Sequence, residues 1–331
     1  MTTIGIIANP ASGKDIRRLV SHATVIDNNE KVNIIERVIL GAQTFGVKKI
    51  YVMPDSFMMG FKVMEKLELS GELNVEIEIL DMKIKASPKD TQVAATMLEE
   101  MQVGCIVVLG GDGTHRLVAK AINKVPLIGI STGTNNAYPK MLEGTVAGMA
   151  AAAAATNAID YETFCERDKI IEVSKNGELV DIALMDVVIS DEIYIGAKAI
   201  WNLETIKHVI VSNCHPASIG FSAILGANIK IEETDDFGAA LKINSGTNHF
   251  LAPIAAGSIV RVTSEEVQRI NLGESFTLEP DYKGMIALDG EREVSFVKGD
   301  LLSFKILRNG PRHVVVNRIL ESALENGFFQ R

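Results

Sequence analysis

Short apolar runs alternate with segments of helical periodicity through the first half of the chain. The strand-like runs lie at residues 4–8, 49–53, 75–80, 105–109 and 126–130. Apolar residues recur every three or four positions in the segments between them, at about 33–45, 57–67, 87–101 and 115–122, and in an alanine-rich stretch at 147–158. This alternation predicts an α/β domain in which helices cover both faces of a parallel sheet.

The pattern changes near residue 160. Asn176-Gly177 favours a tight hairpin turn, and further alternating runs follow at residues 227–232, 239–243, 259–263, 276–278, 284–288, 293–297 and 301–307. We expect one helix among them, at 203–211. The sequence thus predicts an α/β domain over residues 1–160 and a β-rich, mostly antiparallel domain over residues 161–307. A strand-then-helix pattern at the end predicts that residues 308–331 pack back on the first domain.

Composition narrows the class of protein. A chain of 331 residues with 47% hydrophobic and 23% charged residues has enough apolar material for two globular domains. Its net charge of -9 argues against nucleic-acid or anionic-membrane partners. Three widely spaced cysteines indicate neither a disulfide framework nor a zinc site. With no recognisable signal peptide or membrane-spanning stretch, we expect a cytoplasmic protein.

The most informative motif is Gly110-Gly111-Asp112-Gly113-Thr114, which joins a predicted strand to a predicted helix. Glycines there let the backbone turn tightly and let a ligand approach it. The amide groups at the start of a helix bind phosphate. Asp112 is unexpected beside phosphate, unless it binds a metal ion or takes a proton from a hydroxyl. The alternative is that Asp112 is only a helix cap.

Two further polar loops follow predicted strands. The loop at 9–14 lacks the first glycine and the metal-binding Ser or Thr of a Walker A loop. It nevertheless contains residues that can contact a phosphate group, namely Asn9, Ser12, Gly13 and Lys14. The loop at 131–139 carries hydroxyl and carboxamide groups that bind ribose, base or phosphate oxygens. Both also suit ordinary turns. Because strand carboxyl ends share one edge of a parallel sheet, the three loops together predict a nucleotide or sugar-phosphate site.

Acidic residues in the second half are further candidates. Asp186 lies within an apolar run, where a carboxylate needs a cleft or a cation. Asp289-Gly290-Glu291 joins two alternating runs, although Asp-Gly is also a favoured hairpin turn. The acidic run at 232–236 is typical of a solvated turn and is also able to bind a cation. No metal-ligand spacing relates His208, His215 and His249.

In this order the motifs resemble the NAD kinase and diacylglycerol kinase superfamily, whose members carry GGDG in an α/β domain followed by a β-rich domain. Asp90-Thr91, Gly110–Thr114 with Arg116, and the segment 131–136 together are most similar to the ATP-NAD/AcoX kinase family, named after an acetoin-catabolism accessory protein. This resemblance implies binding of ATP with Mg²⁺ or another divalent cation. It also implies transfer of a phosphoryl group to a hydroxyl, with a site between the two domains.

By the same resemblance, Asp112 is the catalytic residue that orients or deprotonates the acceptor hydroxyl. Residues 161–307 would bind the acceptor, with NAD, converted to NADP, as the default. Asp289 and Glu291 would support catalysis or a metal, whose ligands stay unassigned. The predicted cofactor-binding set is Asn9, Ser12, Gly13, Lys14, Gly110, Gly111, Gly113, Thr114, Arg116, Thr132, Gly133, Thr134, Asn135, Asn136 and Asp186.

One position departs from NAD kinases. Where this chain has Met185-Asp186, NAD kinases have an asparagine followed by an acidic residue. Methionine cannot form the hydrogen bonds that asparagine forms. The acceptor, the choice of ATP or polyphosphate as donor, and turnover itself therefore stay open. The hypotheses are a small-molecule kinase, a nucleotide-binding accessory or sensor protein, and a lipid kinase, which the acidic charge disfavours. We expect nucleotide substrates and a homo-oligomer.

Overall fold

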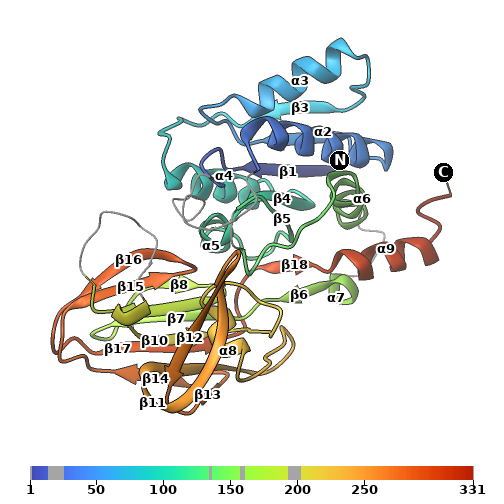
Figure 1. The fold of residues 1–331 in the computed structure, drawn as a ribbon. Coiled ribbons are helices and arrows are strands. Elements are labelled where there is room, and N and C mark those ends of the chain that lie inside the picture. Colours follow the sequence, from blue (N-terminus) through green and yellow to red (C-terminus); the bar gives the residue numbers. More distant parts are fainter. Residues whose placement is uncertain (1, 14–25, 134–135, 157–160, 193–202, 331) are drawn as a thin grey trace.

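The computed structural model describes residues 2–13, 26–133, 136–156, 161–192 and 203–330. It has two regions, one above the other in Figure 1. The upper region is a seven-stranded sheet flanked by helices, and the lower region contains two antiparallel sheets. The predicted α/β half followed by a β-rich half is confirmed. No helix in these ranges is both long and apolar enough to span a bilayer.

The first sheet has the strand order β3-β2-β1-β4-β5-β18-β6. Its strands are β1 (Thr3–Ala8), β2 (Lys49–Val52), β3 (Glu76–Ile79), β4 (Cys105–Gly110), β5 (Leu127–Ser131), β6 (Cys165–Arg167) and β18 (Arg312–Val314). Strands β1 to β5 pair in parallel, whereas β6 runs antiparallel to β18. The central strand β4 is buried along its whole length, as expected for a parallel sheet covered on both faces.

Helices pack on both faces of this sheet. One face carries α2 (Asn28–Thr44), α3 (Met59–Leu69), α6 (Gly144–Ala155) and α9 (Val316–Glu325), and the other carries α4 (Pro88–Glu100) and α5 (Asp112–Ala119). A short helix, α7 (Tyr161–Phe164), leads into β6. Strand β18 and helix α9, red in Figure 1, come from the end of the chain and join the first sheet and helix α6.

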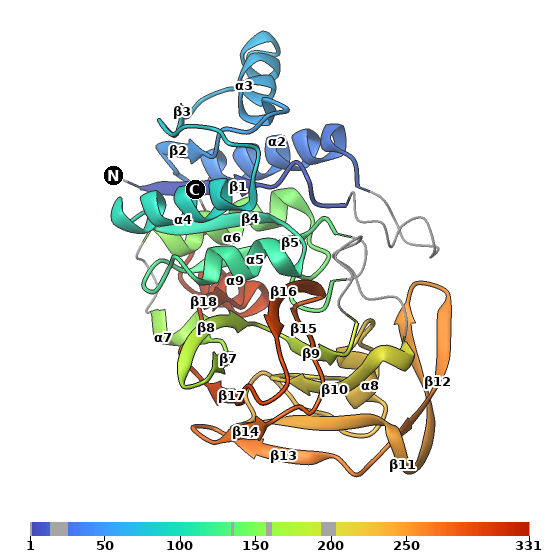
Figure 2. The ribbon, with the colours of Figure 1, turned by 90° about the vertical axis from the view of Figure 1, so that its left-hand side faces the viewer.

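The second region is a pair of packed sheets. One has the order β12-β11-β10-β9-β15-β16 with β13 beside β11, and the other has the order β14-β17-β7-β8. The strands are β7 (Ile170–Lys175), β8 (Glu178–Ala183), β9 (Asp186–Ser190), β10 (Ile206–Val211), β11 (Phe237–Ala255), β12 (Ser258–Ser264), β13 (Gln268–Asn271), β14 (Ser275–Leu278), β15 (Gly284–Leu288), β16 (Glu291–Phe296) and β17 (Leu302–Leu307). Apolar side chains of both sheets form one core between them. Figure 2 shows this region beneath the first sheet from the side.

Two predicted elements of the second region are wrong. Residues 203–211 form a 3-10 turn, η1 (Leu203–Thr205), and then strand β10, because pairing with β9 and β11 on either side buries this run. Residues 227–232 form no strand and contribute only an isolated bridge between Cys214 and Ile231. A short helix, α8 (Ser222–Gly226), precedes them. Apolar runs of this length do not distinguish strand from helix without their tertiary partners.

Helices α2 and α6 cross at two glycines. A Cβ atom built on Gly148 would collide with the carbonyl oxygen of Val38 and the amide nitrogen of Ala42. A Cβ atom on Gly41 would lie 2.5 Å from the carbonyl oxygen of Thr145. Because these neighbours are backbone atoms, they cannot move aside as a flexible side chain would. The alanine-rich sequence of α6 thus serves close helix packing.

We therefore expect Gly148→Ala to destabilise the protein by about 2 kcal/mol or more, since overpacking that forces backbone shifts costs about 1–3 kcal/mol. The free energy of unfolding in urea measures this effect. Thr145→Ala is the matched control, because Thr145 is exposed on the same helix. Equal stability of the two variants would contradict the close crossing.

Candidate functional site

Three polar loops meet at the carboxyl ends of β1, β4 and β5, which are neighbours in the first sheet. The Asn9 carboxamide donates a hydrogen bond to the hydroxyl of Thr114 at 2.9 Å. The hydroxyls of Ser12 and Thr132 lie 2.9 Å apart. Of the predicted cofactor-binding residues, the structure thus brings these four together from three loops. Lys14, Thr134 and Asn135 lie outside the described residues.

The glycines of 110–114 permit close packing in the observed conformation. Gly111 is extended and precedes α5, which begins at Asp112, three residues earlier than predicted. A Cβ atom on Gly111 would lie 3.0 Å from Oδ1 of Asn136, and one on Gly113 would lie 3.0 Å from Oε1 of Glu291. The Glu291 carboxylate therefore reaches the glycine loop from the second region. The structure thus brings Glu291 and the glycine loop together, and both were predicted to belong to the site.

Asp112 lies in the first turn of α5, where a carboxylate interacts favourably with the helix dipole. Its carboxylate accepts hydrogen bonds from the backbone N–H groups of Ala137, at 3.0 and 3.1 Å, and Tyr138, at 2.9 Å. Both N–H groups belong to the backbone of the loop after β5. Asp112 therefore anchors that loop, besides any chemical role.

Two buried residues that the motif search missed support these loops. Lys31 of α2 is fully buried, and its ammonium group donates to the carbonyl oxygens of Asn9 at 2.8 Å and Ser12 at 2.7 Å. His115 is also fully buried, and its Nδ1 lies 2.9 Å from the carbonyl oxygen of Gly111. Since a carbonyl only accepts, Nδ1 carries the proton. Burial lowers the pKa of His115 to about 4, so the ring is neutral.

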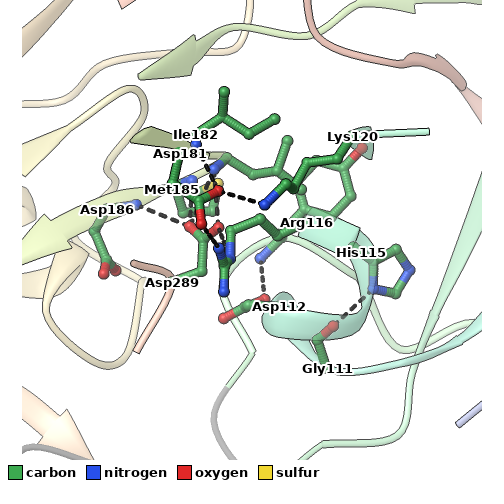
Figure 3. Close-up of polar contacts among 12 residues, drawn as sticks. Gly111, Asp112, His115, Arg116, Lys120, Asp181, Ile182, Met185, Asp186 and Asp289 are labelled. Carbon is green, nitrogen blue, oxygen red and sulfur yellow. Dashed lines mark hydrogen bonds and ion pairs between the residues drawn. The ribbon is translucent and has the colours of Figure 1, made fainter. Parts of the chain in front are cut away.

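Arg116 connects α5 to the second region. Its side chain is 2% exposed, and Nη1 lies 3.0 Å from Oδ2 of Asp181. Its Nε lies 3.9 Å from Oδ2 of Asp289, and Lys120 adds a contact of 2.8 Å to Asp181. We predicted that Arg116 binds the cofactor, but Figure 3 shows the guanidinium directed at these carboxylates. The contacts support a role in holding the two regions together.

Asp289 is an anchor for the backbone. Its carboxylate accepts hydrogen bonds from three consecutive N–H groups, those of Leu184, Met185 and Asp186. Burial raises the pKa of Asp289, while Arg116 and the amides oppose that rise. Asp289 has a positive φ of 49°, followed by Gly290 at 82°, as the predicted hairpin turn requires. These contacts give Asp289 a structural role, and its predicted support of catalysis or of a metal stays a prediction.

Two cavities adjoin the loops. One of about 200 Å³ lies beside Asn9, Pro10 and Ala11 and is also lined by Asp55 and Thr91. The other, of about 310 Å³, lies between the regions and is lined by Ala137 and Tyr138 from the first region and by Met185 from the second. Asp186 is next to Met185 and is 6% exposed. Asp55, which belongs to none of the sequence motifs, accepts hydrogen bonds through its carboxylate from the backbone N–H groups of Phe57 and Met59.

Comparisons with known proteins agree with this architecture. A model of the ATP-NAD kinase N-terminal domain matches residues 4–160, and a model of the acetoin catabolism protein X C-terminal domain matches residues 169–309. Acetoin catabolism protein X of Cupriavidus necator is 37% identical over 309 residues, which are 90% of this chain and 85% of that protein. Yeast NADH kinase, crystallised with NADH, superposes with a TM-score of 0.51 at 12% identity, covering 98% of this chain and 87% of that one. The last comparison shows a shared fold.

The buried ion pair between the two regions yields a stability prediction. Asp181→Asn should lower the free energy of unfolding by about 3 kcal/mol, because removing one partner leaves the other charge buried and poorly compensated. Urea unfolding at neutral pH measures the loss. Glu178→Gln, at an exposed position of the same strand, is the control and should change little. A loss for Asp181→Asn no larger than for Glu178→Gln would contradict the assigned role of Arg116.

Proposed function

Since this chain belongs to the acetoin catabolism protein X family and carries an ATP-NAD kinase N-terminal domain, we propose that it is a phosphotransferase that moves the γ-phosphoryl group of ATP to a hydroxyl. The observation that carries this proposal is the meeting of the loops after β1, β4 and β5 at the start of α5. Backbone amides at a helix start suit phosphate oxygens. Phosphoryl transfer depends mainly on positioning and charge stabilisation, which such loops can supply.

The donor nucleotide would lie across the β1 and β4 loops. Its phosphates would contact the amides of Gly110–Thr114 and the side chains of Asn9 and Ser12. Lys31, fixed below the β1 loop, places a positive charge close to that position. The 200 Å³ cavity beside Asn9 is where we place the nucleoside end. Most ligand pockets are about 300–1,000 Å³, so this cavity suits only part of a nucleotide.

A divalent cation fits the acidic groups that border the glycine loop. Glu291 of β16 reaches this loop, and Asp112 begins α5 with its carboxylate on the amides of Ala137 and Tyr138. Hard cations such as Mg²⁺ prefer carboxylate oxygens and are usually held by one or two carboxylates together with substrate phosphates. When bound, the cation would neutralise charge on the transferred phosphoryl group. Asp112 would orient the acceptor hydroxyl and accept its proton.

The acceptor would bind between the two regions, where residues 161–307 form the far wall. NAD is the default acceptor, and the yeast protein of the same fold was crystallised with NADH. Met185 lines the cavity at this place, and its thioether offers weaker hydrogen bonding than the asparagine found in NAD kinases. Other hydroxyl compounds therefore belong in the same screen.

A nucleotide-binding accessory protein with little turnover is the second candidate. The observation that favours it is the bonding of Asp112 to the amides of Ala137 and Tyr138. Those contacts give the carboxylate a structural role that would persist without catalysis. Tight ATP binding with no acceptor-dependent release of ADP would identify this candidate.

We expect Asp112→Asn to lower acceptor-dependent ADP release by about 10²–10⁴-fold, the usual contribution of a general base. ATP affinity should change far less. The assay follows ADP release with ATP and Mg²⁺ for NAD, NADH and small polyols, and calorimetry measures ATP binding to the same preparations.

Asp27→Asn is the control for this variant. Asp27 also caps a helix, accepting the N–H of Glu30 at 2.8 Å, but it is exposed and precedes α2. It should leave ADP release unchanged. Full activity of Asp112→Asn with the true acceptor would exclude the catalytic role.

A further inference from the structure

A second cluster of polar side chains lies at the β6 edge of the first sheet. In the antiparallel pairing of β6 with β18, His313 is directly opposite Glu166. Residues opposite one another on antiparallel strands have neighbouring side chains. Asp168, two residues beyond Glu166, bonds through Oδ1 to Nδ1 of His313. The pairing of two distant chain segments thus gathers these three groups.

His313 is held with one ring nitrogen directed away from Asp168. The other oxygen of Asp168 accepts a hydrogen bond of 2.5 Å from the hydroxyl of Tyr138, and Asp168 is 7% exposed. Nε2 of His313 lies 3.7 Å from Oε2 of Glu233, in the acidic run at 232–236. A histidine whose Nδ1 is held by a carboxylate, leaving Nε2 to face other ligands, is the arrangement found around metal ions.

The ligand atoms are close enough for one ion. One atom each from Glu166, Glu233 and His313 lies within 4.8 Å of the others. Glu166 also pairs with Arg318 at 2.8 Å, and Glu233 pairs with Lys140 at 3.3 Å. Arg318 is about half exposed and Lys140 is largely exposed, so solvent screening makes both pairs weak. A divalent cation can displace both.

A buried side-chain oxygen without a partner among the described residues lies on a cavity that three of these groups line. Glu233, Asp168 and His313 line the 310 Å³ cavity between the regions, and Asn213 lines it from the second region. Oδ1 of Asn213 is buried and has no hydrogen-bond partner in the part of the chain that the structure describes. A buried acceptor without a partner is unfavourable, because the loss of its contact with water is not compensated. A cation or its bound water in the cavity would satisfy this oxygen.

We propose that Glu166, Glu233 and His313 bind a divalent transition-metal ion, Zn²⁺ or Mn²⁺. A ligand set that mixes imidazole with carboxylates favours these ions over Mg²⁺ and Ca²⁺, which prefer oxygen alone. The ion would join β6 and β18 of the first sheet to the turn at 232–236 of the second region. None of the three proposed ligands belongs to the glycine loop. This metal site is therefore separate from the site proposed for the cation that accompanies ATP.

Titration of the full-length protein with MnCl₂ or ZnCl₂, without nucleotide, tests this site by calorimetry. We expect one ion per chain and a rise in Tm, since a ligand that binds the native state stabilises it. Glu233→Gln should weaken binding at least tenfold, and His313→Gln should abolish it. Glu232→Gln removes the same charge from the neighbouring residue, which pairs with Lys230, and should bind the ion as the wild type does.

Two results would overturn the proposal. One is the absence of saturable binding of either ion to the wild-type protein. The other is equal affinity in Glu233→Gln and Glu232→Gln, which would indicate attraction to the acidic surface alone. Asp112→Asn should bind this ion as the wild type does. Metal binding and the proposed kinase activity can therefore fail independently of each other.

Discussion

The burial of Arg116 is the constraint on which the arrangement of the two regions depends. A guanidinium that is 2% exposed requires compensating carboxylates, and Asp181 and Asp289 of the second region lie beside it. One turn earlier on the same helix, Asp112 holds the loop after β5. Helix α5 therefore fixes the glycine loop relative to the loop after β5 and to the β-rich half at once.

This arrangement explains why so many acidic residues can border a candidate phosphate site. The carboxylate of Asp289 is committed to Arg116 and to the amides of residues 184–186, and Asp112 is partly committed to residues 137 and 138. Lys31 contributes a buried positive charge beneath the β1 loop. The anion binding that we propose at 110–114 would thus depend on backbone amides and on the buried Lys31, and the neighbouring carboxylates would mainly set positions.

Much of the fold and part of the site could be predicted from local patterns. Strand and helix periodicity placed the loops after β1, β4 and β5 at one sheet edge, and Asp-Gly chemistry predicted the positive φ of Asp289. Lys31 was predictable in principle, since it occupies the buried stripe of α2 with Ile35 and Val38. The partners of Arg116 and the gathering of Glu166, Glu233 and His313 depend on contacts between residues far apart in the chain, which periodicity does not encode.

Amide hydrogen exchange with and without ATP and Mg²⁺ tests the central claim most directly, because it locates the nucleotide without assuming an acceptor. The account predicts slower exchange at 110–114 and at 9–12, with little change in the outer strands β12 and β13. Protection confined to the second region, or unchanged exchange at 110–114 under saturating ATP, would contradict a phosphate site at the start of α5.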